Sequence, residues 1–324
     1  MKRKNLLALG LSGALMLSLA ACGGGTTAQT EDKYVVGICQ LAPHPALDAA
    51  TQGFIDTLKE ALGDKVEIRE QNAGGEVPNC GTIIDGFVAE KVDLILANAT
   101  PALTAAASAT ADIPILGTAV TNYGVALELD TTEDKVLGGN ISGTSDLAPL
   151  DQQTQMLHDL FPDAKRVGLL YCSGEANSLF QVEGVKGYLE DMGYECTTYA
   201  FTDVNDLSSV TQNAVDNSDV LYIPTDNAAA NNTETIANIV LPAKMPVVAG
   251  EEGICKGCGC VTLSISYYEL GQITGQQAVD ILTGAKKVSE TPIGFDTTLD
   301  KKYNAANCEA LGVTVPEDYV DIED

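Results

Sequence analysis

Polar and charged side chains recur in this sequence directly after short apolar runs. One run ends at Gln40, another at Asn98 with Thr100 close behind, and a later one at Asp226. Hydroxyl groups beside the N–H groups of a helix start suit a carboxylate, whereas an aspartate or glutamate can pair with an ammonium group. Together these residue types predict a site for a zwitterion. For any one of them alone, capping of the following helix is the better explanation, so the prediction depends on their recurrence.

The candidate ligand-binding residues share this position, at or just beyond the end of an apolar run. They are Gln40, His44, Asn98, Thr100, Thr121, Ser145, Asp146, Asn177, Ser178, Asp226, Asn227 and Glu251. The whole chain has only 2 histidines, which leaves little room for histidine-based catalysis or a histidine-rich metal centre. There is no Gly-x-Ser-x-Gly, no phosphate-binding loop and no Gly-x-Gly-x-x-Gly after the first predicted strand. We therefore expect a binding protein with no cofactor and no metal, and not an enzyme.

The elements that must position these residues alternate between strand and helix. The predicted strands are 34–41, 66–69, 93–97, 115–120, 167–171, 195–201, 220–223 and 247–249. The predicted helices are 45–62, 82–90, 101–110, 152–161, 179–192, 207–217 and 233–241. Nearly continuous apolar strands between amphipathic helices indicate parallel sheets that are covered on both faces. Since the pattern restarts near residue 150, the predicted fold class is α/β, with two doubly wound parallel-sheet lobes joined by a hinge.

The two halves also resemble each other in sequence. Residues 92–100 read Val-Asp-Leu-Ile-Leu-Ala-Asn-Ala-Thr, and residues 218–226 read Ser-Asp-Val-Leu-Tyr-Ile-Pro-Thr-Asp. In both, an aspartate precedes a buried strand with a polar end. A helix follows, and then a second strand that is introduced by an X-Pro pair. Either internal pseudo-symmetry or the shared packing rules of doubly wound folds explains the likeness. We expect the strand ends of both lobes to face a common cleft, where sheets of this kind bind ligands.

Composition excludes several classes of partner. The chain has 18 Lys and Arg against 45 Asp and Glu, a formal net charge of -27. Nucleic-acid binding needs clustered basic side chains, and so does electrostatic docking on anionic lipid. Sugar sites often stack their ligand on Trp, and the absence of Trp here disfavours a sugar. We expect a small-molecule ligand and no nucleic-acid partner.

Residues 1–21 have the pattern of a secretory signal peptide. Basic residues at positions 2–4 precede an apolar run over 6–21 that is too short for a membrane-spanning helix. The run leads into Leu-Ala-Ala-Cys, which resembles a bacterial lipobox with Cys22 as the lipidated residue. Residues 22–32 then form the lipidated cysteine and a flexible tether. We expect an extracytoplasmic protein that is anchored to the cell membrane by a lipid on Cys22; ordinary signal cleavage beside a chance cysteine is the alternative.

Eight cysteines remain when Cys22 is set apart from the nine in the chain. An even number in an exported chain permits disulfides. A Cys-x-x-Cys-x-Cys run at 255–260 could bind a metal only with a fourth ligand from elsewhere, so a loop disulfide or free thiols are favoured. Cys39 and Cys172 lie near the end of the first strand of each lobe and are expected to be buried thiols.

Several distinctive motifs run through the chain that follows the tether. They are Val-Gly-Ile-Cys-Gln-Leu at 36–41, His-Pro-Ala-Leu-Asp at 44–48, Gln-Asn-Ala at 71–73, Ala-Thr-Pro-Ala at 99–102, Ser-Gly-Thr-Ser-Asp at 142–146, Glu-Ala-Asn-Ser at 175–178, Pro-Thr-Asp-Asn at 224–227 and Tyr-Tyr-Glu-Leu-Gly at 267–271. With these motifs the chain resembles the TrpX-like substrate-binding lipoproteins of ABC transporters. The resemblance implies a type I periplasmic-binding-protein fold with three hinge strands. It also implies an aromatic amino acid as ligand (tryptophan, tyrosine or phenylalanine) and its delivery to a membrane permease.

The resemblance also implies where the two lobes divide. Residues 33–144 and 266–287 are assigned to lobe 1, and residues 145–265 and 288–324 to lobe 2. We expect the protein to be a monomer whose lobes close over the ligand.

One departure from the family pattern bears on which ligand the protein binds. After Val120-Thr121 the family has Asp-Pro, whereas this chain has Asn122-Tyr123. Tyr123 joins the candidate residues because its ring could stack on a ligand ring, although a loop aromatic is an equal alternative. His44 is a ligand contact if the family motif applies, and otherwise caps or packs locally. The alternative functions are a binding protein of the same fold for a branched amino acid, a nucleoside or another small solute, and a surface adhesin or sensor subunit.

Overall fold

A computed structural model describes residues 33–129 and 136–322 of the chain. The predicted signal peptide over 1–21, the lipidation site Cys22 and the tether lie outside the described residues. Among the described residues, no helix has both the length and the apolar character needed to cross a membrane.

The first sheet has six strands, and all of their pairings are parallel. In spatial order they are β11 (Gly294–Phe295), β5 (Ile141–Ser145), β4 (Ile115–Val120), β3 (Leu94–Asn98), β1 (Tyr34–Gln40) and β2 (Val66–Asn72). Alternate residues of β3 belong to different clusters, with Leu94 and Leu96 packing in one and Ile95 and Ala97 in the other. Both faces of this sheet are therefore buried, as a continuous apolar strand requires.

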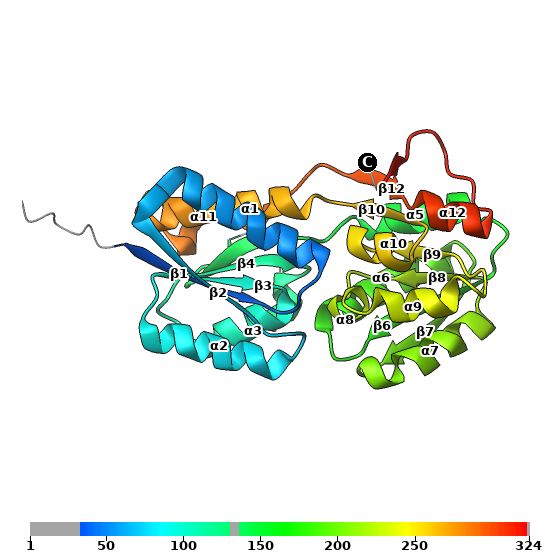
Figure 1. Cartoon of the computed structure of the whole chain (residues 1–324), viewed down its shortest axis with the longest axis horizontal. Helices are drawn as coiled ribbons and strands as arrows, with labels where there is room; N and C mark the ends of the chain where they lie inside the picture. The colour runs from blue at the N-terminus through cyan, green and yellow to red at the C-terminus, as the bar shows by residue number, and fades with distance from the viewer. Residues whose placement is uncertain (1–32, 130–135, 323–324) are drawn as a thin grey trace, which may run out of the picture. The chain divides into compact units, whose positions relative to one another are not determined.

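Helices cover both faces of the first sheet, as Figure 1 shows. They are α1 (Pro45–Leu62), the 3-10 turn η1 (Gly63–Lys65), α2 (Val77–Glu90), α3 (Thr100–Ala109), α4 (Tyr123–Ala126) and α11 (Tyr267–Leu282). α1 and α11 approach so closely that a Cβ atom on Gly271 would lie 2.1 Å from the carbonyl oxygen of Ala50. Only glycine fits there, because a non-bonded Cβ cannot come within 3 Å of a backbone oxygen.

The second sheet repeats the strand order of the first. Its strands in spatial order are β13 (Val320–Asp321), β12 (Asp300–Tyr303), β10 (Val261–Ser264), β9 (Val247–Ala249), β8 (Val220–Ile223), β6 (Arg166–Cys172) and β7 (Glu195–Phe201). The pairings are parallel except between β10 and β12. The order β7-β6-β8-β9-β10 matches β2-β1-β3-β4-β5, so the repeated sequence pattern corresponds to a repeated topology.

Two further groups of helices enclose the second sheet. They are α5 (Leu150–Leu160), α6 (Ala176–Asp191), α7 (Val204–Asn217), α8 (Asn227–Ala230), α9 (Thr233–Val240), α10 (Glu252–Cys258) and α12 (Ala305–Leu311). Side chains of α5, α6 and α12 pack in the cluster on one face, and those of α7, α8, α9 and α10 in the cluster on the other. The predicted α/β class with two parallel-sheet lobes is confirmed.

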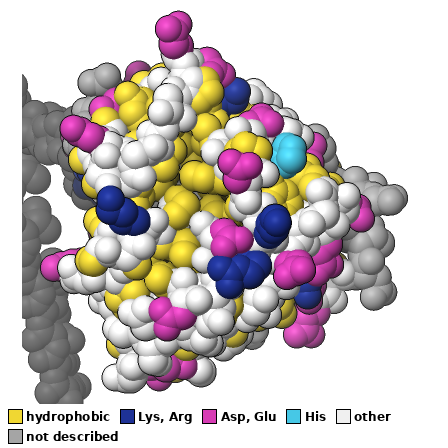
Figure 2. Space-filling model, turned by 90° about the vertical axis from the view of Figure 1, so that its right-hand side faces the viewer, with side chains coloured by type: hydrophobic (Ala, Val, Ile, Leu, Met, Phe, Trp, Pro, Cys, Tyr) yellow, Lys and Arg dark blue, Asp and Glu magenta, His cyan; other side chains and the backbone are white. Residues whose placement is uncertain are grey.

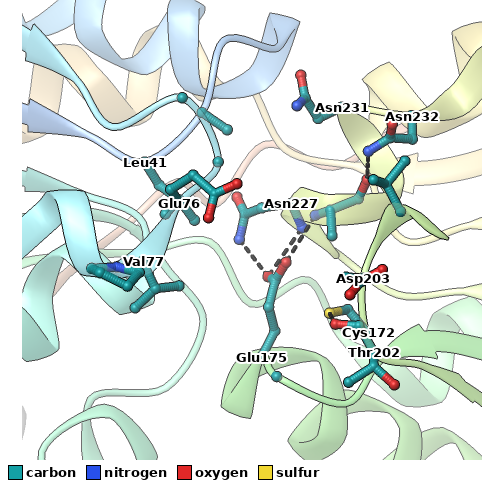
Figure 3. Close-up of a pocket in the computed structure, with 17 residues that line it drawn as sticks. Leu41, Glu76, Val77, Cys172, Glu175, Thr202, Asp203, Asn227, Asn231 and Asn232 are labelled. Carbon is teal, nitrogen blue, oxygen red and sulfur yellow. Dashed lines mark hydrogen bonds between the residues drawn. The ribbon is translucent and has the colours of Figure 1, made fainter. Parts of the chain in front are cut away.

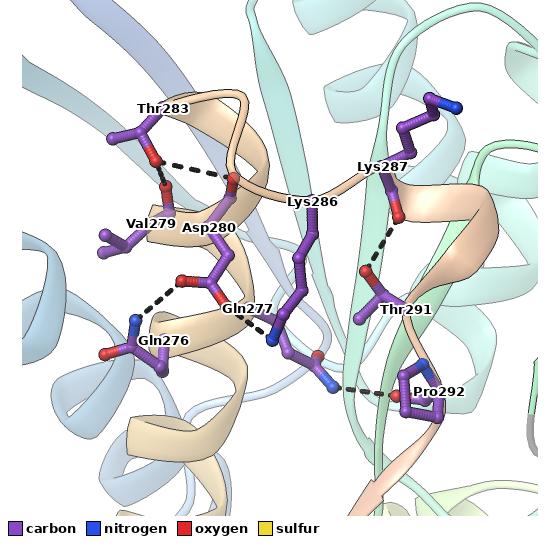
Figure 4. Close-up of polar contacts among 9 residues, drawn as sticks. All are labelled: Gln276, Gln277, Val279, Asp280, Thr283, Lys286, Lys287, Thr291 and Pro292. Atoms are coloured by element: carbon purple, nitrogen blue, oxygen red, sulfur yellow. Dashed lines mark hydrogen bonds and ion pairs between the residues drawn. The ribbon is translucent and has the colours of Figure 1, made fainter.

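The segment after α11 stays with the first sheet longer than expected. A 3-10 turn, η2 (Val288–Glu290), leads into β11, which pairs with β5. The Gln277 side chain donates to the carbonyl of Pro292 at 3.1 Å, and Lys286 forms an ion pair with Asp280 at 2.7 Å (Figure 4). Residues 288–324 were expected in lobe 2, but residues 294 and 295 belong to the first sheet. A two-residue strand has too little periodicity to be recognised from sequence.

Within the described residues the chain passes three times between the two sheets: after β5, after β10 and after β11. These passages are bonded to one another. The Tyr267 hydroxyl donates to Asp146 Oδ2 at 3.0 Å, and the backbone N–H of Ser266 donates to Asp296 Oδ2 at 3.0 Å. The hinge therefore contains a buried carboxylate, since Asp146 is only 3% exposed.

Acidic and basic side chains are intermixed on one face of the molecule. On the face shown in Figure 2, acidic side chains lie scattered around exposed apolar side chains, with a few Lys and Arg among them. This face offers no continuous basic surface for a polyanion.

Candidate functional site

Gln40, Asn98 and Asp226 lie close to the point where the strand order of each sheet reverses direction. In the first sheet this point lies between β1 and β3, and in the second between β6 and β8. Loops leave such a point in opposite directions and open a crevice at the carboxyl ends of the strands. Gln40 ends β1, Asn98 ends β3, and Asp226 follows β8 closely. All thirteen predicted residues, Tyr123 included, are buried, with exposures from 0 to 8%.

Gln40 and Asn98 fasten the start of α1 to the strand ends. Gln40 donates to Asp48 Oδ1 at 2.6 Å and accepts from the Thr51 hydroxyl at 2.6 Å. Asn98 donates to the Leu47 carbonyl and to Thr51 Oγ1, both at 2.8 Å. Both ends of the Gln40 amide are thus used inside the protein, whereas Asn98 Oδ1 has no partner. Asn98 therefore keeps one buried acceptor without a partner.

The backbone beside Asn98 is strained. Ala99 has φ 93° and ψ 156°, a conformation that favours glycine, and Ala119 near the end of the neighbouring β4 has φ 51°. Conformations of this kind cost about 1–3 kcal/mol and cluster at ligand sites. The next residue, Thr100, starts α3, and its buried hydroxyl has no hydrogen-bond partner. Helix capping, the simpler explanation from the sequence, does not account for Thr100.

His44 joins the two lobes through Asn227. Its Nε2 lies 3.2 Å from Asn227 Oδ1. The Asn227 amide in turn donates to Glu175 Oε2 at 2.6 Å, as Figure 3 shows. Asn227 Oδ1 therefore accepts the hydrogen bond from the His44 ring, which assigns the imidazole proton to Nε2. Burial lowers the pKa of His44, so the ring is neutral at pH 7. Its buried Nδ1 has no partner and is a free acceptor.

Glu175 organises the second-lobe side of the site. Its carboxylate accepts from the backbone N–H groups of Asn227 and Ala228 at 3.1 and 2.8 Å. Asn177 donates to the same carboxylate at 3.1 Å and to the Thr225 carbonyl at 3.0 Å, while its Oδ1 stays without a partner. The Asn177 amide also lies 3.3 Å from the Ser178 hydroxyl. Asn177 therefore offers the same kind of free acceptor as Asn98 does in the first lobe.

Asp226 and Glu251 cap short helices. Asp226 accepts from the N–H of Ala229 in α8 at 2.8 Å and from that of Cys172 at 2.6 Å. Glu251 accepts from the N–H groups of Gly253 and Ile254 at the start of α10. Burial raises the pKa of each carboxyl group to about 7, with the Glu175 charge as a second cause for Asp226. Here the capping explanation describes the contacts, and these carboxylates have no free oxygen.

Asp146 lies in the first passage between the sheets, and its contacts differ from those of Asp226 and Glu251. Tyr267 donates to its Oδ2, but its buried Oδ1 has no partner. Burial raises the pKa of Asp146 to about 6, and hydrogen bonds from the side chains of Thr121 and Tyr267 partly oppose this shift. The carboxyl group is mainly ionised at pH 7 and lacks a cationic partner among the described residues.

Thr121, Ser145 and Tyr123 pack around the end of β4. The Ser145 hydroxyl donates to the Thr121 carbonyl at 2.9 Å. The Tyr123 hydroxyl donates to the carbonyls of Gly117 and Thr144, each at 3.1 Å, and its ring lies in the core of the first lobe. These contacts agree better with a local packing residue than with a ring free to stack on a ligand.

Two cavities are lined by residues that belong to the buried set or are hydrogen-bonded to it. One cavity of about 390 Å³ is lined by residues of both lobes, among them Leu41, Glu76, Glu175 and Asn227, and Figure 3 shows these side chains around it. The other, of about 430 Å³, is lined by Pro45, Ala46, Glu251, Tyr267, Lys302 and others. Residues 41 and 42 line the first cavity, and residues 45 and 46 line the second. His44 therefore lies between the two sets of lining residues in the sequence.

Two residues of the site were not predicted. Glu175 stands in the motif Glu-Ala-Asn-Ser, and Tyr267 in Tyr-Tyr-Glu-Leu-Gly, but neither was chosen as a candidate. Glu175 could have been found as a further carboxylate directly after β6. Nothing local marks Tyr267, because its partner Asp146 lies 121 residues away.

Comparisons with known proteins agree with this architecture. Residues 35–322 match the family described as ABC transporter substrate binding protein. The chain is 35% identical over 323 residues to a tyrosine-binding protein of Clostridioides difficile (strain R20291), an alignment that covers 96% of this chain and 92% of the relative.

Two solved structures are similar over most of the chain. One is an ABC domain in complex with L-Trp from Streptococcus pneumonia, with TM-score 0.83, 31% identity, and coverage of 88% of this chain and 97% of that one. The other is the ligand-free, open structure of a substrate binding protein with adhesive properties from Clostridium difficile, with TM-score 0.67, 37% identity, and coverage of 89% and 99%. The chain thus superposes better on the L-Trp complex, although its sequence is closer to the open protein.

Proposed function

The chain belongs to the ABC transporter substrate binding protein family, and we propose that it binds an aromatic amino acid between its two lobes. Tyrosine, tryptophan and phenylalanine are the proposed ligands, and a membrane permease is the proposed recipient. Members of this family act outside the cytoplasm and perform no chemistry on their solute. The type I periplasmic-binding-protein fold supplies the two sheets that would close around it.

One observation carries this proposal. Among the described residues, nine buried side-chain N or O atoms have no hydrogen-bond partner, and five of them belong to residues predicted from the sequence as ligand contacts. The five residues are His44, Asn98, Thr100, Asp146 and Asn177. Leaving a buried polar group unsatisfied costs about 1–3 kcal/mol, so native proteins rarely do so without a reason. A ligand that satisfies these atoms would regain this free energy.

The chemistry of the free atoms suits an α-amino acid. Four of the five are acceptors, and Asp146 Oδ1 carries charge. An ammonium group has three N–H donors and one positive charge, which such a set would bind. The Thr100 hydroxyl can donate to a carboxylate at the start of α3. We propose that the remaining predicted residues, whose polar atoms are bonded within the protein, position these five.

Aromatic ligands are favoured by the relatives. A protein 35% identical to this chain is named for tyrosine, and a solved structure 31% identical holds L-Trp. The better superposition on the L-Trp complex than on the open structure supports closure of the two lobes over the ligand. We also propose that residues 33–144 and 266–295 form one lobe and that the rest of the described chain forms the other. Anchoring by a lipid on Cys22 remains our proposal from the sequence.

The test is to identify the ligand directly. Mass spectrometry of the solute released from the purified protein by denaturation should show an aromatic amino acid. Calorimetry with tyrosine, tryptophan, phenylalanine, leucine and a nucleoside should then rank the aromatic amino acids first. Binding of a nucleoside or a sugar, with no binding of any amino acid, would refute the zwitterion site.

A further inference from the structure

Each lobe carries one pair of buried thiols that are hydrogen-bonded to each other. In the first lobe Cys39 lies near the end of β1 and Cys80 in the first turn of α2, and both are 0% exposed. The Cys39 thiol donates a hydrogen bond to the Cys80 sulfur. This bond and burial both raise the pKa of Cys39, whereas the bond lowers the pKa of Cys80 against the opposite effect of burial. Both side chains pack in the same hydrophobic cluster.

The second pair joins the start of β10 to α12. The Cys308 thiol donates a hydrogen bond to the carbonyl of Cys260 at 3.4 Å and is also hydrogen-bonded to the Cys260 sulfur. Two further bonds hold α12 in place: Asn304 N–H donates to the Cys260 carbonyl at 2.8 Å, and the Asn307 amide donates to the Gly259 carbonyl at 2.9 Å. Cys260 is 0% and Cys308 3% exposed.

The Cys-x-x-Cys-x-Cys run is divided between the two faces of the second sheet. Cys255 and Cys258 pack with α7 and α9, whereas Cys260 packs with Cys308, α5 and α6 on the other face. The Cys258 thiol donates to the Ile254 carbonyl within its own helix. In the described part of the chain, no three His, Cys, Asp or Glu side chains are grouped so as to hold a metal ion. The sequence suggested a local cysteine loop, but the fold gives Cys260 a partner 48 residues away.

We propose that Cys39 with Cys80 and Cys260 with Cys308 form two disulfides, one in each lobe, when the protein folds outside the cytoplasm. The oxidant is a disulfide, either a small molecule or a thiol oxidoreductase. One protein thiolate attacks the donor and releases one thiol, and the second protein thiolate then attacks the mixed disulfide and releases the other. Two protein thiols lose two electrons and two protons, and one donor disulfide becomes two thiols.

The position of the bonds determines what they would do. Each links elements of a single lobe, so neither restrains the movement of one lobe against the other. The first would tie the start of α2 to β1, directly after residues 74–78, which border one opening of the site. The second would tie α12 to the second sheet. Because the four thiols are buried, they react during folding and not in the native state.

Peptide mapping of the refolded protein tests the proposal. The reduced protein is unfolded in guanidinium chloride, refolded with reduced and oxidised glutathione, alkylated, and digested without reduction. Mass spectrometry should show peptides joined through Cys39 to Cys80 and through Cys260 to Cys308. The other four thiols of the described chain should be alkylated: Cys172, Cys196, Cys255 and Cys258. Joined peptides in any other combination, or none, would overturn the proposal.

Thermal unfolding gives a second readout. The oxidised protein should melt at least about 5 °C above the same sample after reduction. The double variant Cys39→Ser, Cys260→Ser should show no such difference, whereas Cys196→Ser, which removes a half-buried thiol with no partner in either pair, should keep it. A difference that persists in the double variant would place the stabilising bonds elsewhere. None of these measurements involves the ligand, so they do not depend on the proposed function.

Discussion

Replacing Asp146 by asparagine should weaken ligand binding and stabilise the ligand-free protein at the same time. Asparagine has the same shape and can still accept the hydrogen bond from Tyr267, but it carries no charge. In the ligand-free protein the Asp146 charge is buried and has no cationic partner among the described residues. In the complex, the proposed ligand supplies an ammonium group to its free oxygen.

The two effects can be estimated. Truncating one partner of a buried charge pair costs about 2–5 kcal/mol, which corresponds to roughly a 30-fold to several-thousand-fold increase in Kd. Burial raises the pKa of Asp146 from 3.8 to about 6. A raised pKa means that this carboxyl group's contribution to folding is fully present below pH 4 and is lost as the pH rises through 6. At pH 7 the loss is on the order of 3 kcal/mol, and Asp146→Asn should recover part of it.

Calorimetry with tyrosine and tryptophan at pH 7.5, together with thermal unfolding without ligand, measures both effects. The control is Asp163→Asn, which removes an exposed carboxylate far from the strand ends and should change neither quantity. An Asp146→Asn variant that binds like the unmodified protein would show that the ligand does not meet this oxygen. A variant that is less stable without ligand would show that the charge has a favourable partner within the protein.

Three further predictions concern the pH dependence of binding, the packing of α1 against α11 and the backbone at Ala99. Kd should rise about tenfold between pH 7.5 and 5, because Asp146 takes up a proton as the pH falls through 6, and Asp146→Asn should remove this dependence in calorimetry. Gly271→Ala should lower the melting temperature, because the added Cβ would lie 2.1 Å from the Ala50 carbonyl oxygen. The control Gly187→Ala, whose Cβ would meet no atom within 4 Å, should raise the melting temperature slightly. Equal shifts in the two variants would contradict the packing argument. Ala99→Gly should stabilise the ligand-free protein by about 1 kcal/mol in denaturant unfolding by relieving its positive φ, and a loss of stability would show that this backbone is not strained.

Much of the fold could be predicted from the sequence because its signals are local. The expected helix 45–62 and strands 115–120, 195–201, 220–223 and 247–249 have the observed bounds. Periodicity of apolar residues alone was sufficient for these elements. The helix expected over 82–90 begins at Val77 instead, because Pro78 fits the first turn of a helix and the amphipathic pattern becomes clear only later.

The short elements needed tertiary information. β11 has two residues and gains its hydrogen bonds entirely from β5, so its sequence has no strand signal of its own. For the same reason the last passage between the sheets lies after residue 295 and not after 287. The shared strand order of the two sheets was suggested by the repeated sequence pattern, but only the pairing of the strands established it.

For the candidate site, the sequence by itself determined which residues are brought to the strand ends. Parallel strands put their carboxyl ends at one edge, so Gln40, Asn98 and Asp226 had to lie near the crevices of the two sheets. Only the tertiary structure decided which of their polar atoms remain free. Asp226 and Glu251 give both carboxylate oxygens to backbone N–H groups, whereas Asp146 and Asn98 keep one acceptor without a partner.

The physical reason is the range of the interactions. Apolar periodicity and helix capping act over a few residues, so a sequence displays them directly. Hydrogen-bond satisfaction depends on partners brought together by the fold, as for His44 and Asn227, which lie 183 residues apart. The same holds for the thiols. Cys260 stands in the sequence run 255–260, but in the folded protein it contacts Cys308. The sequence therefore determined the kinds of side chain at this candidate site, and the tertiary structure decided which of their polar atoms remain without a hydrogen-bond partner.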